Sequence, residues 1–222
     1  REGVAESGAS AVPVSRAAGP LILSDVLLQG IRYLLLLYLG YRSLTYAGAF
    51  LLGSALGAVL GGMVDFGINQ YWLRLTGPDL CLNQRTFSRV LRGKVLACLG
   101  GLLCIGGGIA LGAWSPSLPM AMVVGIGLAA TQVLAETCEA AGLSLHRYQM
   151  VALFRVLMSV GMYGVPLVLA WTLQQEANHA GLDLALLAGL MIGVLLCGLY
   201  ACRMMALLPG GTYGNRGYRR AW

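Results

Sequence analysis

Charged side chains are scarce in this sequence of 222 residues: only 11% of them are Asp, Glu, Lys or Arg, whereas 58% are hydrophobic. A soluble domain usually carries about 25% charged residues. The scarcity of charge therefore excludes an ordinary water-soluble domain. Long uncharged runs that include many of the 32 glycines instead predict an integral membrane protein built from helices.

Sequence motifs that would support catalysis or metal binding are also missing. The six cysteines show no CxxC or Cys/His spacing, so we expect free thiols in apolar packing and no metal site. The glycine-rich run at 105–112 lacks the Lys-Ser/Thr pair of a phosphate-binding loop, and the "DFG" at 65–67 has no other kinase motif around it. With no nucleophile apparent either, we expect neither an enzyme nor a cofactor.

Hydrophobic runs divide the chain into six predicted transmembrane helices, each near the length of about 20 residues that crosses a bilayer. Their expected ranges are 21–41, 45–72, 93–113, 119–141, 150–172 and 182–207. Residues 20–207 are thus expected to form a six-helix membrane bundle. Residues 1–19 are small and polar and are predicted to be a disordered tail, and residues 208–222 a second, flexible tail.

Basic residues gather in alternate loops, which predicts the orientation of the bundle. The basic groups on one side are Arg74, Arg85, Arg89, Arg92 and Lys94 after the second span, His146 and Arg147 after the fourth, and Arg216, Arg219 and Arg220 after the sixth. The positive-inside rule then places both termini in the cytoplasm. The helical spacing within 85–92 also predicts a short surface helix at the lipid headgroups. Because the basic residues are spread over three loops, we expect no nucleic-acid partner.

Glycines recur every four residues on one face of two predicted spans. They are Gly53, Gly57 and Gly61 in the second span and Gly189 and Gly193 in the sixth. Small residues at this spacing allow helix backbones to approach closely within lipid. Two interpretations are open: the faces serve tight static packing, or they let helices slide past one another during a transport cycle.

Polar and ionisable residues inside the spans are the main candidates for function, because charge in the bilayer is costly. They are Asp25, Gln29 and Arg32 in span one, Asp65 and Asn69 in span two, Gln132, Glu136 and Glu139 in span four, and Arg155 in span five. All lie in the predicted cytoplasmic half of their helices. We expect them to line a wet vestibule; the alternatives are structural ion pairs, such as Arg32 with Glu136, and side chains that snorkel to the headgroups.

The segment "LGYRSLTYAGAFLLGSALGAVLGGMVDFGINQYWLR" (39–74) resembles the amino-terminal signature of bacterial polysaccharide flippases. These belong to the multidrug/oligosaccharidyl-lipid/polysaccharide exporter superfamily. The matching motifs are Leu39-Gly40, Tyr46-Ala47-Gly48 with one extra residue, Asp65-Phe66-Gly67-Ile68, and Arg74. The resemblance covers about residues 20–205 and implies one lobe of a two-lobed flippase fold.

The resemblance implies transport of a lipid-linked oligosaccharide or polysaccharide precursor across the bacterial inner membrane, by alternating access driven by an ion or proton gradient. Arg32 and Arg155 would bind the anionic pyrophosphate or acidic sugars, beside the polar Gln29, Asn69 and Gln132. Candidates for ion or proton coupling are Asp25, Asp65, Glu136 and Glu139, because buried carboxylates change their proton affinity readily. The expected partners are membrane lipids and a lipid-linked glycan.

Such flippases contain two similar six-helix lobes, and this sequence supplies only one. Three explanations are open: a second half lies elsewhere in a longer chain, a separate half-lobe pairs with this one, or the lobe has another role. The competing hypothesis is a non-transporting scaffold subunit of a larger membrane complex, bound through the Gly53/Gly57/Gly61 face. A drug exporter of the related toxin-extrusion type would have an acidic pocket without deep arginines, and Arg32 argues against it.

Overall fold

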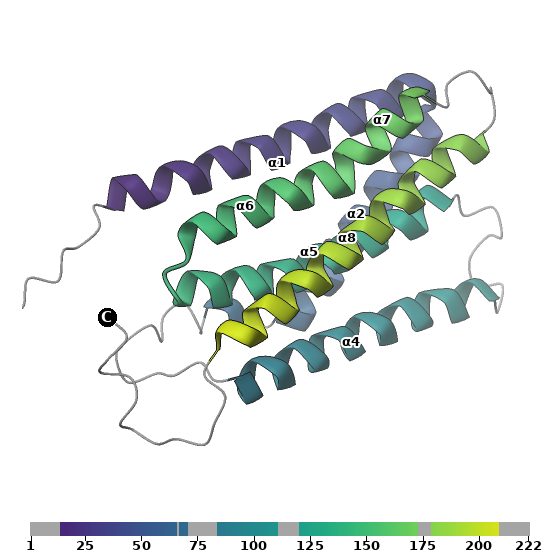
Figure 1. The fold of residues 1–222 in the computed structure, drawn as a ribbon. Helices are drawn as coiled ribbons and strands as arrows, with labels where there is room; N and C mark the ends of the chain where they lie inside the picture. Colours follow the sequence, from purple (N-terminus) through teal and green to yellow (C-terminus); the bar gives the residue numbers. More distant parts are fainter. Residues whose placement is uncertain (1–13, 66, 71–83, 111–119, 173–178, 209–222) are drawn as a thin grey trace, which may run out of the picture.

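The computed structural model describes residues 14–65, 67–70, 84–110, 120–172 and 179–208, with the side chains of all but 14–17, 105–110 and 179–180. All regular structure within these ranges is helical, in agreement with the all-α class predicted from composition (Figure 1). The elements are α1 (Val14–Arg42), α2 (Leu44–Asp65), α4 (Gln84–Ala110), α5 (Met120–Ser144), α6 (Tyr148–Ser159), the π-helical turn η1 (Val160–Gly164), α7 (Val165–Thr172) and α8 (His179–Leu207).

Five helical stretches in the described part of the chain are long and apolar enough to cross a membrane. They are Ala18–Arg42, Leu44–Asp65, Met120–Ser144, Tyr148–Thr172 and Gly181–Leu207. These correspond to the predicted first, second, fourth, fifth and sixth spans. The third predicted span falls in α4, which is not among the five, so a six-span topology and its orientation stay predictions. The chain is an all-α protein with several helices able to span a membrane.

Helix boundaries differ from the expected ones at three places. Helix α1 begins at Val14, so residues 14–19 of the predicted tail are helical. Helix α4 begins at Gln84, so the basic residues of 85–92 belong to this long helix and form no separate surface helix. Helix α2 ends at Asp65, short of the expected residue 72, and is followed by Gly67 with a φ of 73°. Glycine adopts this left-handed conformation without steric cost and commonly follows a helix end.

Several predicted features lie outside the described residues. They are Arg74, Cys81, the turn at 115–119, the tail at 1–13 and the tail from 209 onward. The five described cysteines are free thiols, as the sequence predicts.

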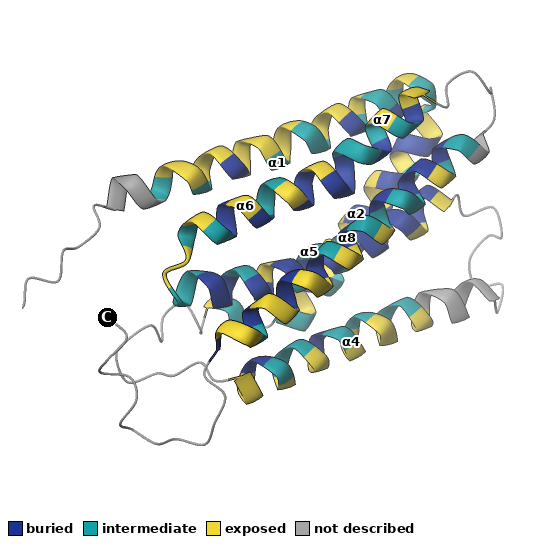
Figure 2. Cartoon of the chain, viewed as in Figure 1, coloured by how far each residue is buried: buried dark blue, intermediate teal, exposed yellow. Residues whose placement is uncertain are grey.

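Helix α5 forms the centre of the bundle. It packs along α2 on one side and against α8 on another, while α1 packs mainly along α6. Large apolar side chains remain exposed on the outer faces of α1, α4 and α8, for example Leu37, Leu96 and Leu195 (Figure 2). A soluble protein rarely exposes so much contiguous apolar surface, whereas helices facing lipid do.

The α2–α5 interface is close enough to exclude any side chain at its glycines. A Cβ atom at Gly53 would collide with the backbone of Met122, and one at Gly57 would lie 2.5 Å from Cβ of Ala129. From the α5 side, a Cβ at Gly125 would lie 2.7 Å from the carbonyl oxygen of Phe50. The predicted tight packing of the glycine face in span two is therefore confirmed, and α5 is its partner.

The fifth predicted span is interrupted by a π-helical turn that the sequence analysis missed. η1 ends two residues before Pro166, whose missing N–H cannot donate to the carbonyl of Met162. A Cβ at Gly189 of α8 would lie 2.7 Å from that same carbonyl oxygen, and Gly193 lies against the Met162 side chain. The predicted glycine face of span six therefore also packs tightly, against the irregular turn.

Candidate functional site

The predicted polar residues lie toward one end of the bundle. This end contains the beginnings of α1, α4 and α6 and the ends of α2, α5 and α8 (Figure 1). The expectation that the polar groups of different spans share one half of the bundle agrees with this arrangement. Which side of the membrane that half faces stays a prediction.

A polar cavity of about 280 Å³ opens between α1, α2 and α5. Its lining residues are Arg32 from α1, Ser54, Ala58, Gly61, Gly62 and Asp65 from α2, and Ala129, Gln132, Val133 and Glu136 from α5. The cavity exists because the residues of α2 that line it are mostly small, and polar side chains of α1, α2 and α5 surround it. The structure thus brings together Arg32, Asp65, Gln132 and Glu136, which the sequence analysis assigned to one vestibule.

Arg32 and Glu136 do not form the ion pair that the sequence analysis considered. The amide of Gln132 donates a hydrogen bond to Oε1 of Glu136, at 3.4 Å along the same helix. Within the described residues, neither Arg32 nor Glu136 takes part in a salt bridge. Arg32 therefore lines a polar cavity and has no fixed counter-ion in the part of the chain that the structure describes.

Lys94 is a central polar residue of this region, although it was grouped with the basic loop residues that come before the third predicted span. Its side chain is only 2% exposed, and its ammonium forms an ion pair with Asp65. It also donates to Oδ1 of Asn69 at 2.9 Å and to Oγ1 of Thr137 at 2.8 Å. Three acceptors thus surround the ammonium, as its three N–H donors require. Asn69, predicted to contact substrate, here contacts Lys94.

Arg155 joins three helices through two carboxylates. Its Nε donates to Oε2 of Glu139 on α5 at 2.7 Å, and its NH1 group donates to Oδ1 of Asp25 on α1 at 2.7 Å. Glu139 is 13% exposed and Asp25 59%, so one pair is largely buried and the other is not. Arg155 was predicted to bind substrate, but it does not line the cavity, and its contacts correspond to the structural ion pairs that were the alternative.

The remaining candidate is Gln29 on α1. Gln29 and Asp25 are exposed, and neither lines the cavity. At the opposite end of the bundle, the hydroxyl of Tyr46 on α2 donates to Asp183 on α8, and that of Tyr38 donates to the carbonyl oxygen of Ala170 at 2.8 Å. That end is therefore connected by neutral donors, whereas the predicted polar end is connected by charges.

A signal for Lys94 was present in the sequence. Lys94 directly precedes the apolar run of the third predicted span, and Asp65 and Asn69 occupy the matching depth at the end of the second. A lysine at this depth needs an acidic partner from a neighbouring helix. Its grouping with the arginines of 85–92 concealed this, because sequence alone does not show which basic residue turns inward.

No metal site emerges from this arrangement in the described residues, because no three His, Cys, Asp or Glu side chains are grouped to hold an ion. Comparison with known proteins gives no further assignment: no family model, curated protein or solved structure matches this chain.

Proposed function

We propose that this chain is one lobe of a membrane transporter that binds an anionic, lipid-linked sugar precursor in the polar cavity and moves it by alternating access. The observation that supports this function best is Arg32, a charged donor deep in a span that faces a cavity and has no ion pair among the described residues. A charged group inside the membrane is costly and usually marks a substrate or ion pathway.

The chemistry of the cavity suits a phosphate or carboxylate group with hydroxyl groups beside it. Arg32 offers several N–H donors in a planar fork that matches phosphate and carboxylate oxygens. Across the cavity, Glu136, Gln132 and Ser54 offer acceptors and donors for hydroxyl groups. Sugar phosphates carry both kinds of group close together.

The size of the cavity suits a headgroup and excludes a whole glycan chain. Its volume of about 280 Å³ lies just below the range of about 300–1,000 Å³ for small-molecule sites. Since only α1, α2 and α5 line it, a second lobe is needed to enclose a larger substrate. The proposed partner is therefore a second half-lobe, and the proposed location is the bacterial inner membrane.

Among the proposed coupling residues, Glu136 is the one best placed to exchange a proton or cation. Asp65, Glu139 and Asp25 each have a basic partner, whereas Glu136 has none within the described residues and lines the cavity. A carboxylate without a fixed counter-ion changes its proton affinity with its surroundings. We therefore assign coupling to Glu136 first.

The test is glycan-export complementation with Arg32→Ala, with Arg42→Ala at the end of the same helix as the matched control. Loss of one charge-assisted contact, worth about 1.5–3 kcal/mol, predicts export reduced by about tenfold or more. Arg42→Ala should export normally. Normal export by Arg32→Ala at an unchanged protein level would exclude Arg32 from the substrate site.

A second candidate function is a non-transporting scaffold subunit, favoured by a different observation. Lys94 and Arg155 use their charges to connect helices of this chain, so much of the predicted polar set serves assembly of the lobe. The Gly53/Gly57/Gly61 face, which was expected to bind the larger complex, is instead packed against α5, so a scaffold would have to use another face. Affinity purification from native membranes in mild detergent distinguishes the two. A stoichiometric complex with unrelated subunits supports the scaffold, whereas a homodimer or a pair of half-lobes that retains lipid-linked sugars supports transport.

A further inference from the structure

We propose that the balance of charge between Lys94 and Asp65 controls whether the second half of α4, from Ala97 onward, stays closed on α2 and α5. The inference concerns regulation of the proposed cavity. It rests on the proposed function in one respect: a cation bound in the cavity is what would change the charge balance. The movement of α4 itself can be measured without any transport.

Lys94 connects α4 to both of its neighbours. Its ammonium donates to Asp65 at the end of α2 and to Thr137 on α5, and it is almost completely buried. Of the three groups that bond to the ammonium, Asn69 and Thr137 are neutral and only Asp65 is charged; Glu136 is also close enough to act on it electrostatically. The first turns of α4 also pack through Phe87, which is fully buried, and the partly buried Val90 and Leu91.

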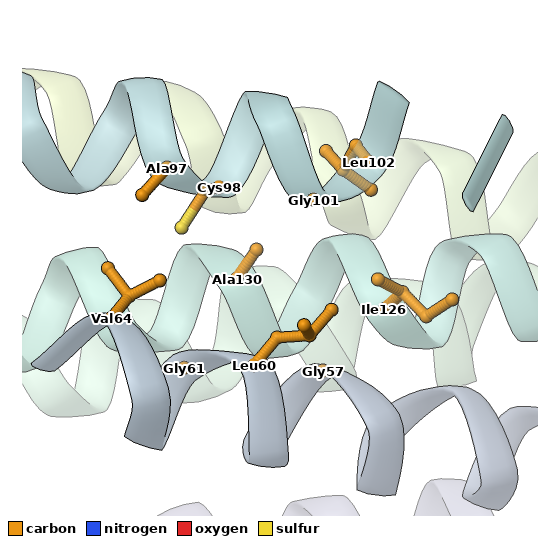
Figure 3. A pocket seen from close by; sticks show the side chains of 10 residues that line it. All are labelled: Gly57, Leu60, Gly61, Val64, Ala97, Cys98, Gly101, Leu102, Ile126 and Ala130. Carbon is orange, nitrogen blue, oxygen red and sulfur yellow. The ribbon is translucent and has the colours of Figure 1, made fainter. Parts of the chain in front are cut away.

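Beyond Lys94 the packing of α4 becomes thin. Ala97, Cys98, Gly101 and Leu102 face α2 and α5 across a small apolar gap of about 30 Å³ (Figure 3). A Cβ at Gly101 would only touch the Leu60 side chain, at 3.7 Å, whereas one at Gly57 in the α2–α5 interface would not fit. Because lipid gives no hydrophobic driving force between helices, an interface with so few contacts is weakly held.

An imbalance of charge at this position should therefore open α4. A buried ion pair contributes little net stability over well-packed apolar groups, but one buried ion without its partner is strongly destabilising. If either charge were lost, the other would have to reach water or headgroups. Lys94 is carried by α4 itself, so an unpaired Lys94 can reach water only if α4 moves. An unpaired Asp65 still has the polar cavity on its other side, so we expect the larger effect when Lys94 is the charge left unpaired.

Asp65 connects the position of α4 to the cavity, because the same carboxylate lines the cavity and pairs with Lys94. The other charged groups at the cavity are Arg32 on α1 and Glu136 on α5. A cation that binds Asp65 from the cavity side would compete with Lys94 and loosen α4. Occupancy of the site would thus be transmitted to a helix that does not line it.

The test uses Cys98, whose sulfur lies in the gap (Figure 3), as a native reporter. Purified protein in detergent is treated with N-ethylmaleimide, and modification of each cysteine is followed by peptide mass spectrometry. Cys104, exposed on the same helix, corrects for access of the reagent. The variants are Lys94→Met, Asp65→Asn, the double variant, and Arg92→Met as the control for loss of an exposed charge on α4.

Cys98 is only partly buried while α4 is closed. We expect it to react about threefold faster or more in each single variant, with the larger change in Asp65→Asn, because its labelling rises with the population of the open state. In the double variant and in Arg92→Met it should react within about twofold of the wild-type rate. Buried Cys138 and Cys197 should stay unmodified, which shows that the rest of the bundle is folded. If Lys94→Met does not fold, Asp65→Asn and the double variant still decide the question.

Two results would overturn the proposal. Wild-type labelling of Cys98 in folded single variants would mean that charge does not hold α4. Fast labelling in the double variant as well would mean that α4 needs the specific bonds of Lys94 and does not respond to charge balance. Either result leaves the export test of Arg32 unaffected, so failure of this proposal and failure of the proposed function can be told apart.

Discussion

Two of the neighbours of helix α5, α2 and α4, are attached to it in opposite ways. Against α2 the helix backbones touch, and Gly53, Gly57 and Gly125 leave no room for one more atom. Against α4 an apolar gap remains, and the buried ammonium of Lys94 donates a hydrogen bond to Thr137 of α5. In lipid, helices have no hydrophobic driving force for association, so both interfaces depend on packing and polar contacts.

The difference shows which interface can change without rebuilding the fold. Dispersion contacts between backbones are short-ranged, so the α2–α5 interface is either closed or lost. An electrostatic contact can be weakened by a competing ion while the helices stay intact. We therefore regard α2–α5 as the fixed frame of the lobe and α4 as its adjustable part.

The largest expected effect comes from breaking the fixed frame with Gly53→Leu. The new side chain would meet the backbone of Met122, which cannot rotate away, so the two helices must separate. Overpacking typically costs about 1–3 kcal/mol and more when backbone must move. We expect loss of monodisperse protein in size-exclusion chromatography after detergent extraction.

The matched control for Gly53→Leu is Gly48→Leu on the same helix. Gly48 is exposed, and a Cβ there meets nothing within 4 Å. This variant should elute like the wild type with a similar yield. Equal behaviour of the two variants would show that α2 and α5 are not in backbone contact.

The next largest effect is expected for Arg155→Met. This variant tests a second set of ion pairs between helices, beside the ion pair of Lys94. The change leaves Glu139, 13% exposed, without its basic partner on α6. Removing one partner of a buried pair costs about 3–5 kcal/mol, and partial exposure places this case near the lower limit. Unfolding titrations in sodium dodecyl sulfate measure it, with exposed Arg147→Met as the control. A loss below about 1 kcal/mol would show that water already reaches Glu139.

Much of this frame could be predicted from the sequence, because its signals are local. Apolar length predicts the helices, and the spacing of Gly53, Gly57 and Gly61 predicts a face that packs closely. The polar residues of several helices share one end because alternate spans run in opposite directions. Arg32, Asp65, Gln132 and Glu136 were therefore expected together, and they are.

The pairing of charges could not be predicted, because it depends on how each helix is rotated and on its neighbours. Lys94 continues a series of basic residues whose other members, Arg85, Arg89 and Arg92, are exposed, and only the fold shows that it turns inward. Arg155 and Arg32 both occupy deep positions, yet one is paired with two carboxylates and the other faces the cavity. Depth in a span identifies a costly charge but not its partner.

A smaller effect is expected for Thr137→Val, which weakens the adjustable interface without changing its charge. Thr137 accepts from Lys94 at 2.8 Å and donates to the carbonyl oxygen of Val133 at 3.0 Å. Loss of one hydrogen bond to a charged group predicts a cost of about 1.5 kcal/mol in the same unfolding titration. The control is Thr131→Val, because that hydroxyl donates to the carbonyl oxygen of Gly127 within its own helix. Equal costs for the two variants would mean that Thr137 does not contribute to holding α4.

The smallest effect is expected for Asp25→Asn, which removes the exposed partner of Arg155. Asp25 is 59% exposed, so water and headgroups already solvate its carboxylate, and a surface ion pair contributes about 0–1 kcal/mol. We expect a loss below about 0.5 kcal/mol that disappears as salt is raised, since salt screens exposed charges. Glu139→Gln, which removes the less exposed partner of the same guanidinium, should cost more and should respond less to salt. If the two losses were equal and equally insensitive to salt, both carboxylates would be shielded from water. The ion pairs of Arg155 would then resemble the shielded ion pair between Lys94 and Asp65.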